Sequence, residues 1–434
     1  MRTIGSSAYN RCMTPEADLL TRSWGGWPAA VRNDPYPVLA ALRAERPVHP
    51  VRLADGHDAW LVLGHEAVRV ALMDPRFSKD MVSALADDPD VADPGLPGPA
   101  LARHMMNLDP PDHTRLRRLA ARAFLPSRIA RLERAAQQLV DDLLDRLHVA
   151  GSDAVVDLVG GFARPFPFQV ICELLGVDED ERAGFAEAFR VLLRPYLGAP
   201  PPAARAASDA IVTGLERLVA SHRADLEQGR PREDLVGVLV SAGDDERLTE
   251  QELLSTLFQL FVAGHDTTTS LIGNGVVALL DHPDQWRLLC AEPARIPAAI
   301  EELVRFDTPA LHATFRVATA DVELEGWTIP AGAQVLVCIG AANHDPSVHD
   351  HAEELDITRP PRAHLGFGHG IHHCLGAPLA RMEGRIAFER LTRRFPDLTL
   401  AVDRDALQWS EGDGLVLRGL AELPVRLGRS PVRA

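Results

Sequence analysis

A glycine-rich stretch near the end of the chain carries the residues best suited to chemistry. It runs from His364 to Gly376, reads HLGFGHGIHHCLG, and surrounds a single cysteine, Cys374, with four glycines. Residues 377–388 are predicted to form a helix. Glycine lets the backbone approach a bulky group closely, and amides at a helix N-terminus favour a thiolate. A thiolate held by nearby amides is the axial ligand that a haem iron requires for cleavage of an oxygen–oxygen bond.

The cysteine alone allows two other interpretations. Cys374 is then a small buried residue in a tight turn, which is the usual state of a free cysteine. A zinc site made of His372, His373 and Cys374 is less favoured, because adjacent residues do not easily face one ion and no second ligand pair lies nearby. A c-type haem is excluded, because the chain has no Cys-x-x-Cys-His motif.

A second group of reactive residues, AGHDTT at 263–268, lies in a predicted long helix over 248–281. Thr249 and Glu252 form a capping-box pattern at its start. Glycine costs about 1 kcal/mol inside a helix, and a threonine hydroxyl that bonds back one turn bends it. We therefore expect Gly264–Thr267 to break the helix, open a pocket, and direct Asp266 and Thr267 into it. A kink made only for packing is the alternative.

Composition limits the class of protein. The chain has 434 residues and a formal charge of −16, which argues against general nucleic-acid binding. Lys79 is the one lysine, and five scattered cysteines fit a reducing cytoplasm. The first 28 residues have no secretory pattern, and no run of 18 apolar residues occurs. We expect a cytoplasmic protein with no membrane span.

The elements that must position these residues are mostly helical. Apolar residues recur at helical spacing between charged ones, whereas residues 49–63 read as a β-hairpin turning at Asp55-Gly56 and residues 315–337 as a small sheet. Residues 1–35 are expected to be an extended lead-in, 84–100 a long loop, 195–202 a hinge, and 411–414 a turn between short strands. The sequence predicts a mainly α fold with small β-sheets, forming one domain over 1–434. The other predicted helices are 34–46, 65–73, 109–124, 166–175, 179–192, 203–227, 283–290 and 295–306.

Several of these motifs together resemble the cytochrome P-450 family. The spacing Phe367-x-x-Gly370-x-x-x-Cys374-x-Gly376 resembles its haem-binding loop, and AGHDTT resembles its oxygen-activating segment. Glu302-x-x-Arg305, followed by Arg359, resembles its buried ion pair. The resemblance runs from about His49 to the end. With DPPDHTRLRR at 109–118, it is greatest to soluble bacterial members, in particular actinobacterial ones that act on macrolide polyketides.

The resemblance implies a cofactor and its ligands. The family fold is one large helical domain around a buried haem b, and Cys374 would be the axial ligand of its iron. Asp266 would relay protons, and Thr267 would hydrogen-bond dioxygen. The implied cofactor-binding residues are the loop positions Phe367, Gly370 and Gly376 and the propionate-binding His113, Arg117, Arg316 and His372.

The resemblance also implies an activity: a monooxygenase that uses dioxygen and electrons from a ferredoxin and its ferredoxin reductase. The substrate would be a small apolar molecule, a macrolide or polyketide, hydroxylated or epoxidised in antibiotic biosynthesis. Other natural products, a peroxide-dependent haem-thiolate enzyme and a non-catalytic haem protein are the alternatives. The implied pocket walls are 84–100, Phe258, Val262, Ala263 and Pro309–Ala313, and a basic patch for the ferredoxin is expected at Arg115, Arg118, Arg122 and Arg128.

Overall fold

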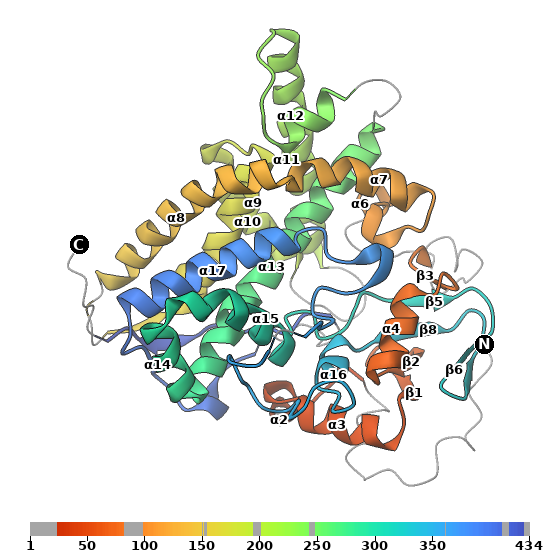
Figure 1. Cartoon of the computed structure of the whole chain (residues 1–434). Helices are drawn as coiled ribbons and strands as arrows, with labels where there is room; N and C mark the ends of the chain where they lie inside the picture. The colour runs from red at the N-terminus through yellow and green to blue at the C-terminus, as the bar shows by residue number, and fades with distance from the viewer. Residues whose placement is uncertain are drawn as a thin grey trace.

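Helices make up most of the chain in a computed structural model (Figure 1). The structure describes residues 24–81, 99–149, 151, 154–193, 201–242, 248–360, 362–409 and 416–428. The predicted mainly α class is confirmed. The helices are α2 (Ala29–Asn33), α3 (Tyr36–Glu45), α4 (His65–Met73), α6 (Pro99–Ala102), α7 (Asp112–Ala120), α8 (Pro126–His148), α9 (Pro165–Leu175), α10 (Glu179–Leu192), α11 (Pro202–Glu227), α12 (Leu235–Val240), α13 (Glu250–Asp281), α14 (Pro283–Ala291), α15 (Ile296–Phe306), α16 (Ile339–Asn343) and α17 (Ala377–Arg394).

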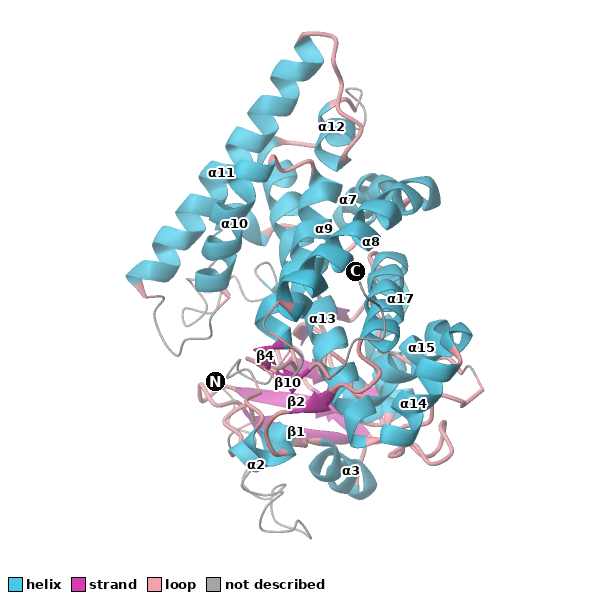
Figure 2. Cartoon of the chain, turned by 90° about the vertical axis from the view of Figure 1, so that its left-hand side faces the viewer, coloured by secondary structure: helices cyan, strands magenta, loops and turns pink. Residues whose placement is uncertain are grey.

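Three small sheets lie beside the helices, below the helical bundle in Figure 2. The largest has the order β1-β2-β8-β5-β3, and its β2–β8 pair is parallel, with Ala59 opposite Gln334. The second has the order β4-β10-β9, and the third pairs β6 with β7. The strands are β1 (Val48–Arg52), β2 (Asp58–Val62), β3 (Phe77–Ser78), β4 (Val155–Asp157), β5 (Arg316–Ala318), β6 (Val322–Leu324), β7 (Trp327–Ile329), β8 (Gln334–Val337), β9 (Thr399–Leu400) and β10 (Pro424–Arg426).

Most predicted elements are present close to their predicted bounds. The hairpin at Asp55-Gly56 joins β1 and β2, and Gly56 has the positive φ of 91° that such a turn favours in glycine. The extended lead-in is wrong in part, because Ala29–Asn33 forms α2. The long loop also ends earlier than predicted, because Pro99–Ala102 forms α6. Residues 1–23 and 82–98, most of the hinge at 195–202 and the turn at 411–414 lie outside the described residues.

The long helix α13 crosses the core, and its capping box is confirmed: Glu252 N donates to Thr249 Oγ1, and Thr249 N donates to the Glu252 carboxylate. The predicted break is wrong, because α13 is helical throughout Glu250–Asp281. A Cβ at Gly264 would lie 2.8 Å from Ile171 Cδ1 of α9. Glycine is therefore present to let two helices approach each other, which is the packing alternative.

No helix in the described ranges combines the length and apolarity that a membrane crossing requires.

Candidate active site

The loop before Cys374 folds back so that its amide meets the start of the motif. Cys374 N donates to the carbonyl oxygen of Phe367 at 2.8 Å. Gly368 and Gly370 both have φ of +71°, which side chains disfavour. A Cβ at Gly370 would lie 3.1 Å from the carbonyl oxygen of Leu72 at the end of α4. The glycines therefore provide the turn and the close approach that shape the loop.

Cys374 lies three residues before the start of α17. The residue is accessible to solvent, although protein atoms surround much of its sulfur. Burial raises the pKa of its thiol, while the backbone N–H groups of Gly376 and Ala377 and the charges of Arg117 and Arg381 lower it by less. The amides therefore act in the expected direction, but burial outweighs them in the protein by itself. A thiol ligand loses its proton when it binds a metal, so these donors prepare the sulfur for that step.

Two arginines from outside the loop hold it in place. Arg117 of α7 donates to the carbonyl oxygen of His373 at 2.5 Å. The guanidinium carbon of Arg381 lies 4.4 Å from the centre of the Phe367 ring, a cation–π contact. Arg381 also donates to both oxygens of Glu301, at 2.7 and 2.8 Å. Burial raises the pKa of Glu301, but hydrogen bonds from Arg381 and His364 outweigh it, and the pKa falls to about 2.

Three residues that the sequence placed near the propionates gather beside this loop. The rings of His113 and His372 lie 4.4 Å apart. Both ring nitrogens of His113, Nε2 of His372 and Nε of Arg316 are buried without a hydrogen-bond partner among the described residues. Burial, followed by nearby cations, lowers the pKa of His372 to about 2, and burial lowers that of Arg316 to about 10. Unpaired buried donors in a cationic setting call for an anion, and the carboxylates of a haem fit this donor set.

Lys79 belongs to the same cationic group, and the sequence did not assign it a role. The ammonium donates to the carbonyl oxygens of Thr314 and Phe315, each at 3.1 Å, and to the Thr314 hydroxyl. Burial and the nearby Arg316 charge lower its pKa well below the ordinary value, and Asp109 opposes them. No local pattern in the sequence indicated this burial, which a lysine tolerates only with such partners.

Asp266 and Thr267 lie in the middle of α13. Thr267 Oγ1 donates to the carbonyl oxygen of Ala263 at 3.0 Å, the predicted bond back to the preceding turn. Ala263 is exposed and Val262 is partly buried, although most of the helix around them is buried. Helix α13 packs against α17, which begins after Cys374, and the two lie side by side in Figure 1. The acid and the alcohol therefore lie on a helix adjacent to the cysteine-bearing element.

A buried glutamate on α17 was also missed by the sequence analysis. Glu383 is fully buried, and neither carboxyl oxygen has a hydrogen-bond partner among the described residues. Burial raises its pKa well above the ordinary value, and the neighbouring Thr268 hydroxyl opposes the rise. The signal was available in the sequence, since Glu383 shares the buried face of α17 with Leu379 and Ile386. Burial beside α13 thus favours the protonated form of this carboxyl.

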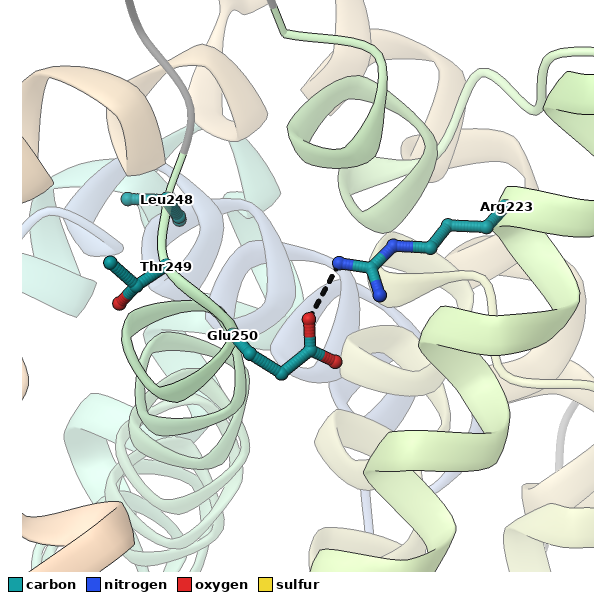
Figure 3. Close-up of a pocket in the computed structure, with 4 residues that line it drawn as sticks. All are labelled: Arg223, Leu248, Thr249 and Glu250. Carbon is teal, nitrogen blue, oxygen red and sulfur yellow. Dashed lines mark hydrogen bonds and ion pairs between the residues drawn. The ribbon is translucent and has the colours of Figure 1, made fainter. Parts of the chain in front are cut away.

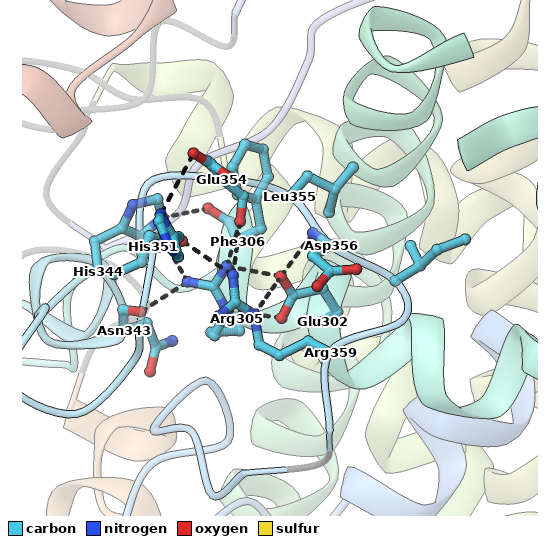
Figure 4. Close-up of polar contacts among 12 residues, drawn as sticks. Glu302, Arg305, Phe306, Asn343, His344, His351, Glu354, Leu355, Asp356 and Arg359 are labelled. Carbon is cyan, nitrogen blue, oxygen red and sulfur yellow. Dashed lines mark hydrogen bonds and ion pairs between the residues drawn. The ribbon is translucent and has the colours of Figure 1, made fainter. Parts of the chain in front are cut away.

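The predicted ion pair is buried and joined by the third residue, as expected (Figure 4). Arg305 donates to both oxygens of Glu302 at 2.7 Å, and Arg359 donates to one of them at 3.2 Å. The same Arg305 also donates to the carbonyl oxygens of Asn343, Ala352 and Glu354. Because these carbonyls belong to the end of α16 and to the irregular chain that follows it, the pair holds the approach to the cysteine loop in position.

The arginines of the expected basic patch are less available to bind a ferredoxin than the sequence indicated. Arg115 forms an ion pair with Glu252, and Arg128 donates to the carbonyl oxygen of Glu233. Two of the four arginines are therefore already bound within the protein.

The expected pocket walls are only partly accessible. Phe258 is buried and stacks on Phe189 in the core, 6.0 Å between ring centres. Leu311 and His312 within 309–313 are also buried. A surface hollow of about 520 Å³ lies elsewhere, between α11 and the start of α13, with Arg223 bound to Glu250 (Figure 3). None of the site residues predicted from the sequence lines this hollow.

Comparison with known proteins gives one family. The Cytochrome P450 family profile matches residues 51–417. A vitamin D(3) 25-hydroxylase from Pseudonocardia autotrophica is 42% identical, with 91% of this chain and 94% of that protein covered. A mycinamicin IV hydroxylase/epoxidase from Micromonospora griseorubida is 40% identical, with 88% and 93% covered. The tirandamycin C-bound P450 monooxygenase TamI has a similar structure, with a TM-score of 0.83, 41% identity, and 93% and 99% covered.

The profile covers most of the chain, and the relatives match it over nearly their whole length. The profile matches the chain from within β1, through the cysteine loop and α17, to Leu417, which lies between β9 and β10. The chain belongs to the cytochrome P450 family of monooxygenases.

Proposed function

We propose that this P450 binds haem b through Cys374 and inserts one oxygen atom into an apolar macrolide or polyketide in the cytoplasm. The other oxygen atom leaves as water, and two electrons from a ferredoxin and its reductase are consumed with two protons. The observation that carries the proposal is the set of buried, unpaired nitrogens of His113, His372 and Arg316 at the Cys374 loop. Bound haem supplies the activation of dioxygen.

The chain's own residues would bind the haem, hold the cysteine loop in place and transfer protons. Cys374 Sγ would bind the haem iron, and the N–H groups of Gly376 and Ala377, which hydrogen-bond to the sulfur, would stabilise its thiolate. The buried nitrogens of His113, His372 and Arg316 would hold the propionates, and Arg117 holds the loop through its hydrogen bond to His373 O. Asp266 and Thr267 on α13 handle protons on the side where Ala263 is exposed.

A carbon monoxide difference spectrum tests the haem-thiolate part of the proposal. The reduced wild-type protein is expected to give the red-shifted Soret band of a thiolate ligand. Cys374→His is expected to lose that band while retaining the described fold. A histidine-type band in the wild-type protein would instead favour the second candidate, a non-catalytic haem protein.

The substrate class rests on the relatives. The names of the relatives include a macrolide-type substrate, mycinamicin IV, and also vitamin D(3). Because vitamin D(3) is not a polyketide, a non-polyketide natural product is the alternative substrate. A parallel titration of the ferric protein with macrolides, tirandamycin C and vitamin D(3) separates them. We expect a macrolide or tirandamycin C to produce the low-spin to high-spin shift at the lowest concentration; a lower concentration for vitamin D(3) would favour the alternative.

A further inference from the structure

Two neighbouring side chains on α13, His265 and Asp266, lie within ion-pair distance of each other. His265 Nδ1 lies 2.6 Å from the carbonyl oxygen of Phe261. Because a carbonyl oxygen only accepts, Nδ1 carries a hydrogen. The other ring nitrogen, Nε2, lies 3.2 Å from Asp266 Oδ1.

This second contact lies at ion-pair distance, and it is favourable when the pair holds one more proton. A neutral imidazole with hydrogen on Nδ1 presents a lone pair at Nε2, and an ionised carboxylate presents only lone pairs. The two atoms attract each other when a proton lies on Nε2, giving imidazolium and carboxylate, or on Oδ1, giving imidazole and carboxylic acid. Both arrangements have the same total charge, so the pair shares one labile proton.

The surroundings exclude water from the His265 side of the pair and leave the Asp266 side open to solvent. His265 is 5% exposed, and the rings of Phe168 from α9 and Phe189 from α10 lie 5.5 and 6.0 Å from it. The Asp266 side chain is 28% exposed. Within the described ranges, His265 is the one basic residue in ion-pair contact with Asp266. The nearby acidic residue on the neighbouring helix α17 is Glu383, which lies beside Thr268. The aromatic walls strengthen the contact by excluding water.

Thr267 follows the pair directly, and its own hydrogen is used in the bond to Ala263 O. Its hydroxyl oxygen therefore offers lone pairs, and a proton for the reaction must come from another group. We propose that His265 and Asp266 form a proton-storing pair that releases its shared proton beside Thr267 during turnover. Release leaves the pair with one negative charge, and a solvent proton that enters at the exposed side of Asp266 restores it. His265 is a positioning residue that acts through Asp266, and this role rests on the proposed monooxygenase function.

A spectroscopic experiment tests the shared proton without any turnover. The holoenzyme is labelled with [15N]histidine, reduced and bound to carbon monoxide so that its iron is diamagnetic, and His265→Gln identifies the His265 signals by their loss. In the wild type, Nε2 is expected at a protonated or strongly hydrogen-bonded shift. In Asp266→Asn, the 15N chemical shift of His265 Nε2 is expected to move to the value of an unprotonated imidazole nitrogen at the same pH. A wild-type Nε2 that is already unprotonated and unchanged in Asp266→Asn would overturn the proposal.

A turnover experiment tests the release. The chain offers a matched control in His222 on α11, whose Nδ1 lies 2.7 Å from Leu218 O and whose Nε2 lies 2.9 Å from Asp234 Oδ1. With the ligand that gives the strongest spin shift, product formed per electron pair is measured against pH. In the wild type this yield is expected to fall at high pH, where the pair no longer holds its shared proton. His265→Gln and His265→Phe are expected to remove that fall and to lower the yield at least about tenfold, since a positioned proton donor contributes about 10²–10⁴-fold. His222→Gln is expected to keep both the yield and the fall.

Haem content and thermal unfolding of each variant separate these effects from misfolding. Wild-type yield and pH profile in both His265 variants would refute the release step. A wild type that forms no product with any ligand would refute the proposed function instead, while the nitrogen spectrum would still decide the shared proton.

Discussion

The guanidinium of Arg117 on α7 is hydrogen-bonded at 2.5 Å to the carbonyl oxygen of His373, the residue before Cys374. A helix far away in sequence is thereby attached to the loop that bears the sulfur. Arg117 also lowers the pKa of Cys374 through its charge. One side chain thus contributes both to the loop geometry and to the stability of a thiolate at Cys374.

Arg117→Leu is expected to loosen the haem. A hydrogen bond from a charged group is worth about 1.5–3 kcal/mol, so loss of haem to apomyoglobin should be at least about tenfold faster. The control is Arg134→Leu, which removes the same charge from an exposed position on α8. Equal haem-loss rates for the two variants would show that Arg117 does not hold the loop.

Arg305→Leu is expected to destabilise the protein strongly. It leaves the buried Glu302 carboxylate with Arg359 as its remaining cation, and breaking a buried pair costs about 3–5 kcal/mol. Arg69→Leu is the control, because its pair with Glu66 is exposed and worth no more than about 1 kcal/mol. Urea unfolding of the two variants measures the difference, and similar free energies of unfolding would contradict a structural role for the buried pair.

Gly264→Ala is expected to lower stability although alanine favours helices. The added Cβ would lie 2.8 Å from Ile171 Cδ1, and overpacking costs about 1–3 kcal/mol. The helix preference of alanine returns at most about 1 kcal/mol. In an Ile171→Val background, where Cδ1 is absent and Cγ1 at 3.0 Å remains, Gly264→Ala is expected to be less destabilising. Thermal unfolding of the four proteins of this cycle measures the coupling, and an equal effect in both backgrounds would refute the packing explanation.

The free energy of unfolding is expected to fall in acid because buried histidines must gain protons. Burial lowers the pKa of His344 to about 3, against the bond to Phe306 O, and those of His104 and His349 to about 4. The unfolded chain binds protons below about pH 6.5 and the folded protein does not, so stability is full above that pH. Each histidine then costs about 1.4 kcal/mol per pH unit as the pH falls towards its folded pKa.

His344→Phe isolates one of these contributions. Phenylalanine keeps the stacking on Tyr36, where the ring centres lie 4.0 Å apart, but binds no proton. Urea unfolding at pH 7, 6 and 5 is expected to give a slope smaller than that of the wild type by one proton. The variant is less stable at pH 7, because the bond from His344 Nε2 to Phe306 O is lost. Parallel slopes for the two proteins would show that His344 does not contribute.

Local sequence signals predicted the elements well. Helix α10 begins after Asp178 with three acidic residues and ends as its apolar spacing ends, so its bounds match the prediction. The Glu302–Arg305 pair was likewise found from its spacing and family resemblance. Both are properties of neighbouring residues, which a sequence displays directly.

Long-range burial is what the sequence did not display. Lys79 is satisfied by Thr314 and Phe315, about 235 positions away, and no local pattern indicates that contact. Gly264 was interpreted as a helix break because its partner, Ile171, belongs to another helix. The paired arginines of the expected basic patch were missed for the same reason, since Glu252 and Glu233 lie in distant segments.

The parallel pairing of Ala59 with Gln334 has a consequence for biosynthesis. The β1–β2 hairpin leaves the ribosome long before β8 is made, and at roughly 5–20 residues per second the delay is on the order of tens of seconds. During that time the edge of β2 has no partner and can pair with another chain. Slowed translation between these strands should therefore increase aggregation of the newly made protein, with no change in the stability of molecules that have finished folding.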